Sequence, residues 1–126
     1  MDDEVKATLD GQFSEFAKYM GTDRDGTSID LYRSDYWLRQ SKVLDDRVLT
    51  MTDTGLIWLQ FGKTELAYNN WCKYLTELCI VKNLCQAEVE VNLTCCGLPG
   101  VVPVLVPQYR SFFDTYKFKN RLINEL

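Results

Sequence analysis

Near the start of the chain, apolar residues recur every three or four positions, with charged residues between them. Because an α-helix turns once in about 3.6 residues, this spacing places the apolar residues on one helix face. The pattern predicts an amphipathic helix over residues 5–20, ended by Gly21 in the left-handed conformation common at helix C-termini. The residues that carry this spacing are Leu9, Phe13, Phe16 and Met20.

A short strand and a second helix are expected next. Residues 29–31 alternate apolar and polar side chains, as a strand with one buried face does. Ser34 is a good N-cap residue and predicts a second helix that carries Trp37 and Leu38. An acidic turn over residues 45–47 then leads to the second half of the chain.

The same order of elements recurs in that second half. Thr52 with Asp53 is expected to cap a third helix, and residues 65–67 form a second short strand in which Leu66 corresponds to Ile29. Two helix–loop–helix units whose short strands pair are the architecture of an EF-hand pair. We therefore predict a mainly α fold with an EF-hand-like pair of units. The fourth helix carries Trp71, Tyr74, Leu75, Leu78 and Cys79.

The first loop resembles a calcium-binding loop that lacks part of its ligand set. With Gly26 at the sixth position, Asp23 and Asp25 fall at positions 3 and 5, but position 1 is Gly21 and position 12 is Tyr32. A calcium loop needs a bidentate Glu at position 12 and six to eight oxygen ligands in all. We therefore expect no bound metal, and we expect both aspartates to cap the loop backbone, as Asp does in turns.

The region after the fourth helix fits two interpretations. Val89, Val91 and Leu93 alternate as a strand would, whereas the preceding Gln-Ala-Glu run favours a helix. Gly and Pro at positions 97–100 end either element. We predict a helical domain over residues 1–97.

An extended arm, residues 98–126, is predicted to follow the helical domain. Its three prolines recur every four residues, which disfavours helix and sheet. Its last part is aromatic and basic. One interpretation is a terminal helix packed on the domain; the other, which we favour, is a segment that docks on a partner. The predicted partner-binding residues are Tyr109, Arg110, Phe113, Tyr116, Lys117, Lys119 and Arg121.

Composition excludes several function classes. The formal net charge of −4 disfavours nucleic acid as a partner. No stretch approaches the roughly 20 apolar residues of a membrane span, and the acidic first residues predict no secretory signal. Histidine is absent, so the commonest general base and metal ligand are missing. No nucleophile–base pair can be named, and we expect a non-enzymatic, cytoplasmic protein without a cofactor.

Five cysteines are expected to be reduced thiols. Cys72 and Cys79 lie two turns apart on one helix face, which indicates the core. The spacing of Cys85, Cys95 and Cys96 lacks the close pairs of a zinc site, so we expect them to be buried free thiols. Trp37, Trp58 and Trp71 are likewise expected in the core.

The segment from Leu9 to Cys79 resembles the p25-alpha domain of the tubulin polymerization-promoting proteins. Order and spacing carry the resemblance rather than one short motif. The matching features are Phe13 and Phe16, the loop from Gly21 to Ile29, Tyr36-Trp37, Asp46-Arg47, residues 48–53 (VLTMTD) and residues 66–71 (LAYNNW).

The resemblance implies an EF-hand-like fold that does not bind calcium in the usual way. It also implies binding to tubulin, with stabilisation or bundling of microtubules. The chain departs from the family in its last part, where an aromatic and basic tail replaces a Gly-rich basic segment. Neither a P-loop nor a dinucleotide fingerprint is present, so nucleotide hydrolysis is not carried over. The zinc binding associated with the family would use His and Cys, and because this chain lacks His, zinc binding is not carried over.

Three functions follow as hypotheses. The first is a tubulin- and microtubule-binding protein of the cytoskeleton, with a fixed place in a stable lattice such as the axoneme of a cilium or sperm flagellum. The second is an EF-hand-like interaction or divalent-ion-responsive module acting outside the cytoskeleton, which a metal-dependent thermal shift would reveal. The third is a weak nucleotide hydrolase, for which no residue can be nominated. The oligomeric state is left open.

Overall fold

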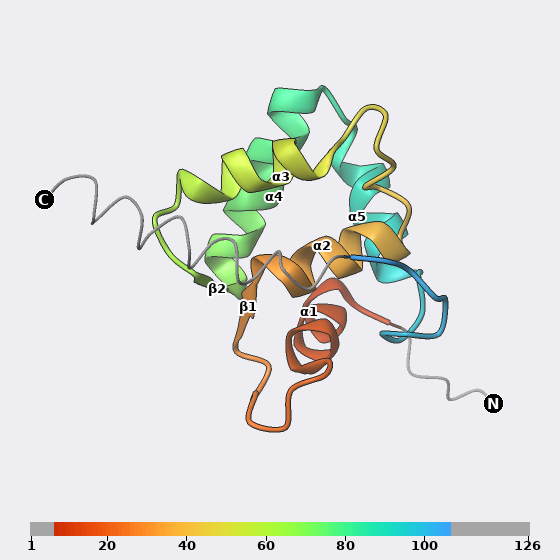
Figure 1. Cartoon of the computed structure of the whole chain (residues 1–126). Coiled ribbons are helices and arrows are strands. Elements are labelled where there is room, and N and C mark those ends of the chain that lie inside the picture. Colours follow the sequence, from red (N-terminus) through yellow and green to blue (C-terminus); the bar gives the residue numbers. More distant parts are fainter. Residues whose placement is uncertain (1–6, 107–126) are drawn as a thin grey trace, which may run out of the picture.

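A computed structural model describes residues 7–106 of the chain, and within them the fold is mainly helical (Figure 1). One short strand lies between the first two helices and the other lies between the third and fourth helices. The elements are α1 (Leu9–Lys18), β1 (Ser28–Asp30), α2 (Leu31–Gln40), α3 (Met51–Leu59), β2 (Glu65–Ala67), α4 (Tyr68–Lys82) and α5 (Gln86–Thr94).

The two strands form an antiparallel sheet. Ile29 lies opposite Leu66 in the register, and neither side chain is exposed to solvent. The sheet therefore joins the loop after α1 to the loop after α3, residues almost forty positions apart in the chain. This confirms the prediction that the two short strands pair and that Leu66 corresponds to Ile29.

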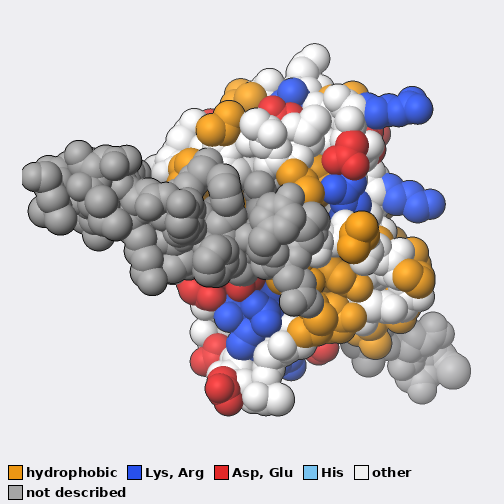
Figure 2. Space-filling view, viewed as in Figure 1, with side chains coloured by type: hydrophobic (Ala, Val, Ile, Leu, Met, Phe, Trp, Pro, Cys, Tyr) orange, Lys and Arg blue, Asp and Glu red, His pale blue; other side chains and the backbone are white. Residues whose placement is uncertain are grey.

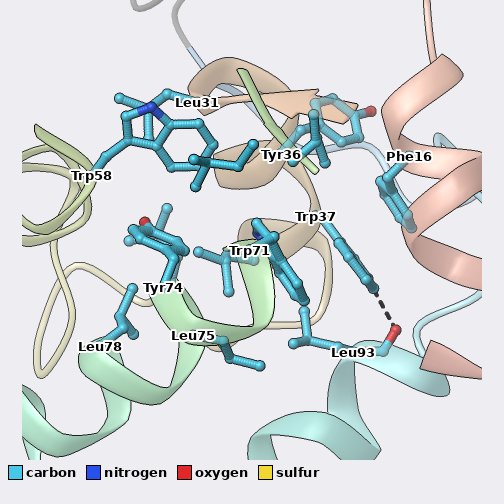
Figure 3. Packing of buried hydrophobic residues seen from close by; sticks show 14 of the residues in the cluster. Phe16, Leu31, Tyr36, Trp37, Trp58, Trp71, Tyr74, Leu75, Leu78 and Leu93 are labelled. Carbon is cyan, nitrogen blue, oxygen red and sulfur yellow. Dashed lines mark hydrogen bonds between the residues drawn. The ribbon is translucent and has the colours of Figure 1, made fainter. Parts of the chain in front are cut away.

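The core is built around a stack of aromatic rings. Trp37 of α2 lies between Phe16 and Trp71, with ring centroids 5.2 and 4.7 Å apart and interplanar angles of 11° in both pairs. Trp58 meets Tyr74 edge to face at 5.0 Å. These rings come from α1, α2, α3 and α4 and pack in one cluster (Figure 3). All three tryptophans are at most 2% exposed, as predicted.

Two predicted helix ends are wrong. The left-handed residue after α1 is Met20, with φ 59°, rather than Gly21. Helix α2 begins four residues earlier than expected, because the Asp30 carboxylate accepts a hydrogen bond from the Arg33 amide at 2.9 Å and caps it. Ser34, the predicted cap, lies inside the helix, where its hydroxyl accepts a 3.0 Å hydrogen bond from the Trp71 indole.

Helix α3 also begins earlier than predicted. Thr50 is the N-cap, and its side chain and that of Asp53 accept each other's backbone amides, in a capping box. The ambiguous region after α4 is a helix, since Val89 and Leu93 are buried while Val91 is 59% exposed. A strand would have placed all three side chains on one face.

The segment after α5 contains neither helix nor strand over residues 95–106. It turns at Leu98–Val101 and then passes back over the helices, where Val106 is only 4% exposed and Val104 packs on the core. The irregular chain matches the expectation for this stretch. The proposed boundary between residues 97 and 98 stays a prediction.

Candidate functional site

The calcium-like loop is held closed by an arginine. The guanidinium of Arg24 donates to both Glu65 carboxylate oxygens, at 2.8 and 3.1 Å, and to the backbone oxygens of Ala17 and Ser28. These acceptors come from α1, β1 and β2. A positive group that gathers several oxygens from separate parts of a loop does what a bound cation does in a calcium loop.

A second arginine holds the other side of the same loop. Arg33 of α2 pairs with Asp30 at 2.7 Å and donates to the backbone oxygen of Tyr19 at 2.6 Å. The end of α1 is thereby tied to the start of α2. Both of these contacts use the planar, many-donor geometry of guanidinium, which an ammonium group does not reproduce.

The carboxylates of the two loop aspartates do not converge on one point. Asp25 accepts from the Thr27 hydroxyl at 2.7 Å and from the Thr27 amide at 3.0 Å, and these hydrogen bonds lower the pKa of its carboxyl. Asp23 is exposed. Tyr32, at the twelfth position, is 9% exposed and packs against the ring of Tyr36. Within residues 7–106, no group of three or more acidic, Cys or His side chains converges.

Gly26 keeps the role that glycine has in calcium loops. Its φ is +82°, and a Cβ there would lie 2.5 Å from the Ser14 hydroxyl of α1. The loop thus passes directly over the first helix, and only glycine satisfies both the conformation and the close approach. The sharp turn is retained although the ion ligands are not.

Glu65 of β2 is the acidic partner of Arg24 in the loop. Burial by itself would raise the pKa of its carboxyl, but the hydrogen bonds from Arg24 and Ser28 overcome this effect and leave the pKa below its ordinary value. The Arg24–Glu65 pair is partly buried, with side-chain exposures of 20% and 38%. Glu65 was not singled out from the sequence, because its partner lies 41 residues away.

The cysteines differ from the expectation of buried thiols. Cys85 and Cys95 are exposed and Cys96 is half-buried, since they lie at the two ends of α5 rather than on its inner face. Cys79 is buried as predicted and Cys72 is half-buried, and burial raises the pKa of both thiols. No disulfide joins the five.

Every predicted partner-binding residue, from Tyr109 to Arg121, lies outside the described residues. The described part contains a further feature that the sequence did not indicate. Gln12 and Gln40, both buried polar residues, donate to backbone oxygens of the segment after α5. These contacts join residues 58 to 85 positions apart in the chain, and no short-range sequence pattern predicts them.

Comparison with protein families matches residues 10–118 to p25-alpha. The chain belongs to the p25-alpha family. The matched region covers most of the chain and confirms the resemblance stated for Leu9 to Cys79. The p25-alpha family is a structural and binding family associated with tubulin- and microtubule-binding proteins. Comparison with curated proteins found no match.

Among the helices of residues 7–106, none has the length and apolar character to span a bilayer. Family membership adds an association with the cytoskeleton.

Proposed function

We propose that this chain is a non-enzymatic protein that binds tubulin and stabilises or bundles microtubules in the cytoplasm. The single observation that carries the proposal is the p25-alpha match over residues 10–118. The match extends past the described helices into the aromatic and basic tail. Its span thus includes the helical domain from residue 10 and the tail as far as residue 118, whereas Lys119 and Arg121 follow it.

The helical domain serves in this proposal as an EF-hand-like scaffold kept for its shape. Supporting it are the order helix, strand, helix in both halves and the antiparallel pairing of β1 with β2. Arg24 further supports a scaffold over an ion-responsive module, because its guanidinium already gathers the loop oxygens. A divalent cation would have to displace a like charge to enter.

The tail is proposed as one contact with tubulin, whose surface is strongly acidic. Basic side chains next to aromatic ones suit such a surface, since charge steers the encounter and aromatic rings supply most of the buried contact area. We also propose a fixed place in the axoneme of a cilium or flagellum. The proposed contact residues are Tyr109, Arg110, Phe113, Tyr116, Lys117, Lys119 and Arg121.

Co-sedimentation with taxol-stabilised microtubules at low ionic strength tests the proposal. We expect the wild-type chain in the pellet, and we expect the variant Lys117→Glu/Lys119→Glu to remain largely in the supernatant. The matched control is Lys63→Glu/Lys73→Glu, which changes the same net charge at two exposed lysines of the domain. Wild-type protein in the supernatant refutes the function. Equal pelleting of both variants refutes only the role of the tail.

A further inference from the structure

The segment after α5 is attached to the helices by two buried glutamines. Gln12 of α1, 4% exposed, donates to the Gly97 oxygen at 2.9 Å. Gln40 of α2, 3% exposed, donates to the Cys96 and Leu98 oxygens at 3.0 and 2.9 Å. These two amides fix the position of the turn relative to two different helices.

The far side of the turn is equally constrained. The Gly100 amide donates to the side-chain oxygen of Gln40 at 3.0 Å, so both ends of that amide are used. Gly100 has φ +86°, and a Cβ there would lie 2.6 Å from the Tyr19 hydroxyl. The Val101 amide closes the turn on the Leu98 oxygen at 3.2 Å. A turn fixed at this many points has little conformational freedom left to lose on binding.

This constrained segment packs Val104 and Val106 on the core but leaves four other apolar side chains exposed. The exposures of Leu98, Val101, Val102 and Leu105 are 58%, 60%, 43% and 81%. Single exposed apolar residues are ordinary, but four within eight positions form a patch. We call these four residues the apolar face. Figure 2 shows apolar side chains gathered over this part of the molecule, with both basic and acidic side chains near them.

The surroundings of the apolar face suit a partner with carboxylates. Lys42 is exposed and follows Gln40 by two residues, so it lies at the end of α2 where the turn is attached. Leu98 also lines an open hollow of about 530 Å³ between α1 and α5. Glu15, the carboxylate in that hollow, is within 3.8 Å of Lys18, which offsets its charge. Lys42 forms no ion pair within residues 7–106, so its ammonium can meet a partner's acidic group.

We propose that the apolar face is the surface through which the folded domain docks on tubulin, at an apolar patch of the partner bordered by carboxylates. This inference rests on the proposed function. The face ends one residue before Val106, and the chain continues from there into the basic tail, so one continuous segment supplies both contacts. Linking two weak contacts in this way raises overall affinity without new interactions.

The test uses the full chain with its tail unchanged. The variant is Val101→Ser/Leu105→Ser, and the matched control is Ile80→Ser/Val81→Ser, which alters two apolar side chains that are 66% and 57% exposed at the end of α4. Because all four residues are exposed, we expect thermal unfolding of both variants to remain close to that of wild type. Microtubule affinity of the first variant should fall about tenfold, and that of the control should be unchanged.

The outcomes separate this inference from the function on which it rests. If wild type and both variants pellet alike, the apolar face is not the docking surface, while tubulin binding stands. If both variants lose affinity equally, binding is not confined to this face, and the inference is again overturned. Wild-type protein that never pellets overturns the proposed function and the inference together. A salt titration adds a second readout, in which Lys42→Ala reduces the salt dependence of binding.

Discussion

Replacing Arg24 by Met tests whether a guanidinium has taken over the structural role of an ion. The substitution keeps a long apolar stem and removes all four hydrogen bonds to Ala17, Ser28 and Glu65. Among the hydrogen bonds within residues 7–106, Glu65 would keep the one from Ser28. The loop would then lose the group that joins α1 to the two-stranded sheet.

The cost follows from the contacts and their exposure. Hydrogen bonds to charged groups contribute about 1.5–3 kcal/mol each when buried. The Arg24 and Glu65 side chains are 20% and 38% exposed, so solvent screening reduces their share. We expect a total loss of about 2–3 kcal/mol in the free energy of unfolding. For a domain of roughly 100 residues this lowers Tm by about 10–20 °C.

Urea unfolding followed by tryptophan fluorescence measures this loss, since all three tryptophans lie in the core. Arg47→Met is the matched control, because Arg47 is exposed, and it should change stability by less than about 0.5 kcal/mol. A double-mutant cycle with Glu65→Gln isolates the pair. If Arg24→Met is as stable as Arg47→Met, or if the cycle shows no coupling, the guanidinium does not hold the loop.

Three further predictions concern other parts of the fold. Gln40→Leu removes three hydrogen bonds to the turn and should cost about 1–3 kcal/mol, and faster hydrogen exchange confined to residues 97–101 would show that the turn is released. Asp53→Ala removes the capping box and the 3.3 Å contact with Lys82; it should cost about 1–2 kcal/mol, and Asp53→Asn should recover part of this in urea unfolding. Folding lowers the pKa of Glu65 below its ordinary 4.5, so its contribution is complete above that value and is lost as the pH falls through the folded pKa. Unfolding free energy should therefore decline as the pH falls below about 5, and that of Arg24→Met should decline less steeply.

The repeated order of elements and the core residues could be predicted from the sequence, because both depend on local spacing. The correspondence of Ile29 with Leu66 is an example, although the first strand covers Ser28–Asp30 and was predicted one residue late, over residues 29–31. Helix starts were less predictable. Ser34 has good capping chemistry, but Asp30 caps instead, because its carboxylate meets both the Arg33 amide and the Arg33 guanidinium.

The contacts that give the candidate sites their geometry are almost all long-range. Arg24 meets Glu65 across 41 positions, and Gln40 meets Leu98 across 58. Residue type alone does not distinguish these side chains from ordinary surface Arg or Gln. Periodicity was also insufficient after α4, where alternation of Val89, Val91 and Leu93 indicated a strand, yet burial of the first and third fits a helix.

The arginine contacts bear on how the apolar face would be presented. In calcium sensors the ion arrives from solution, and its binding changes the angle between helices and exposes an apolar surface. Here the cation is a side chain of the chain itself, so the cross-link is present whenever the domain is folded. The same helix, α1, carries the Ala17 oxygen held by Arg24 and the Gln12 amide that holds the turn. Because Arg24 closes the loop and holds α1, it also fixes the helix to which the turn is attached. The apolar face therefore stays exposed without an ion-dependent step.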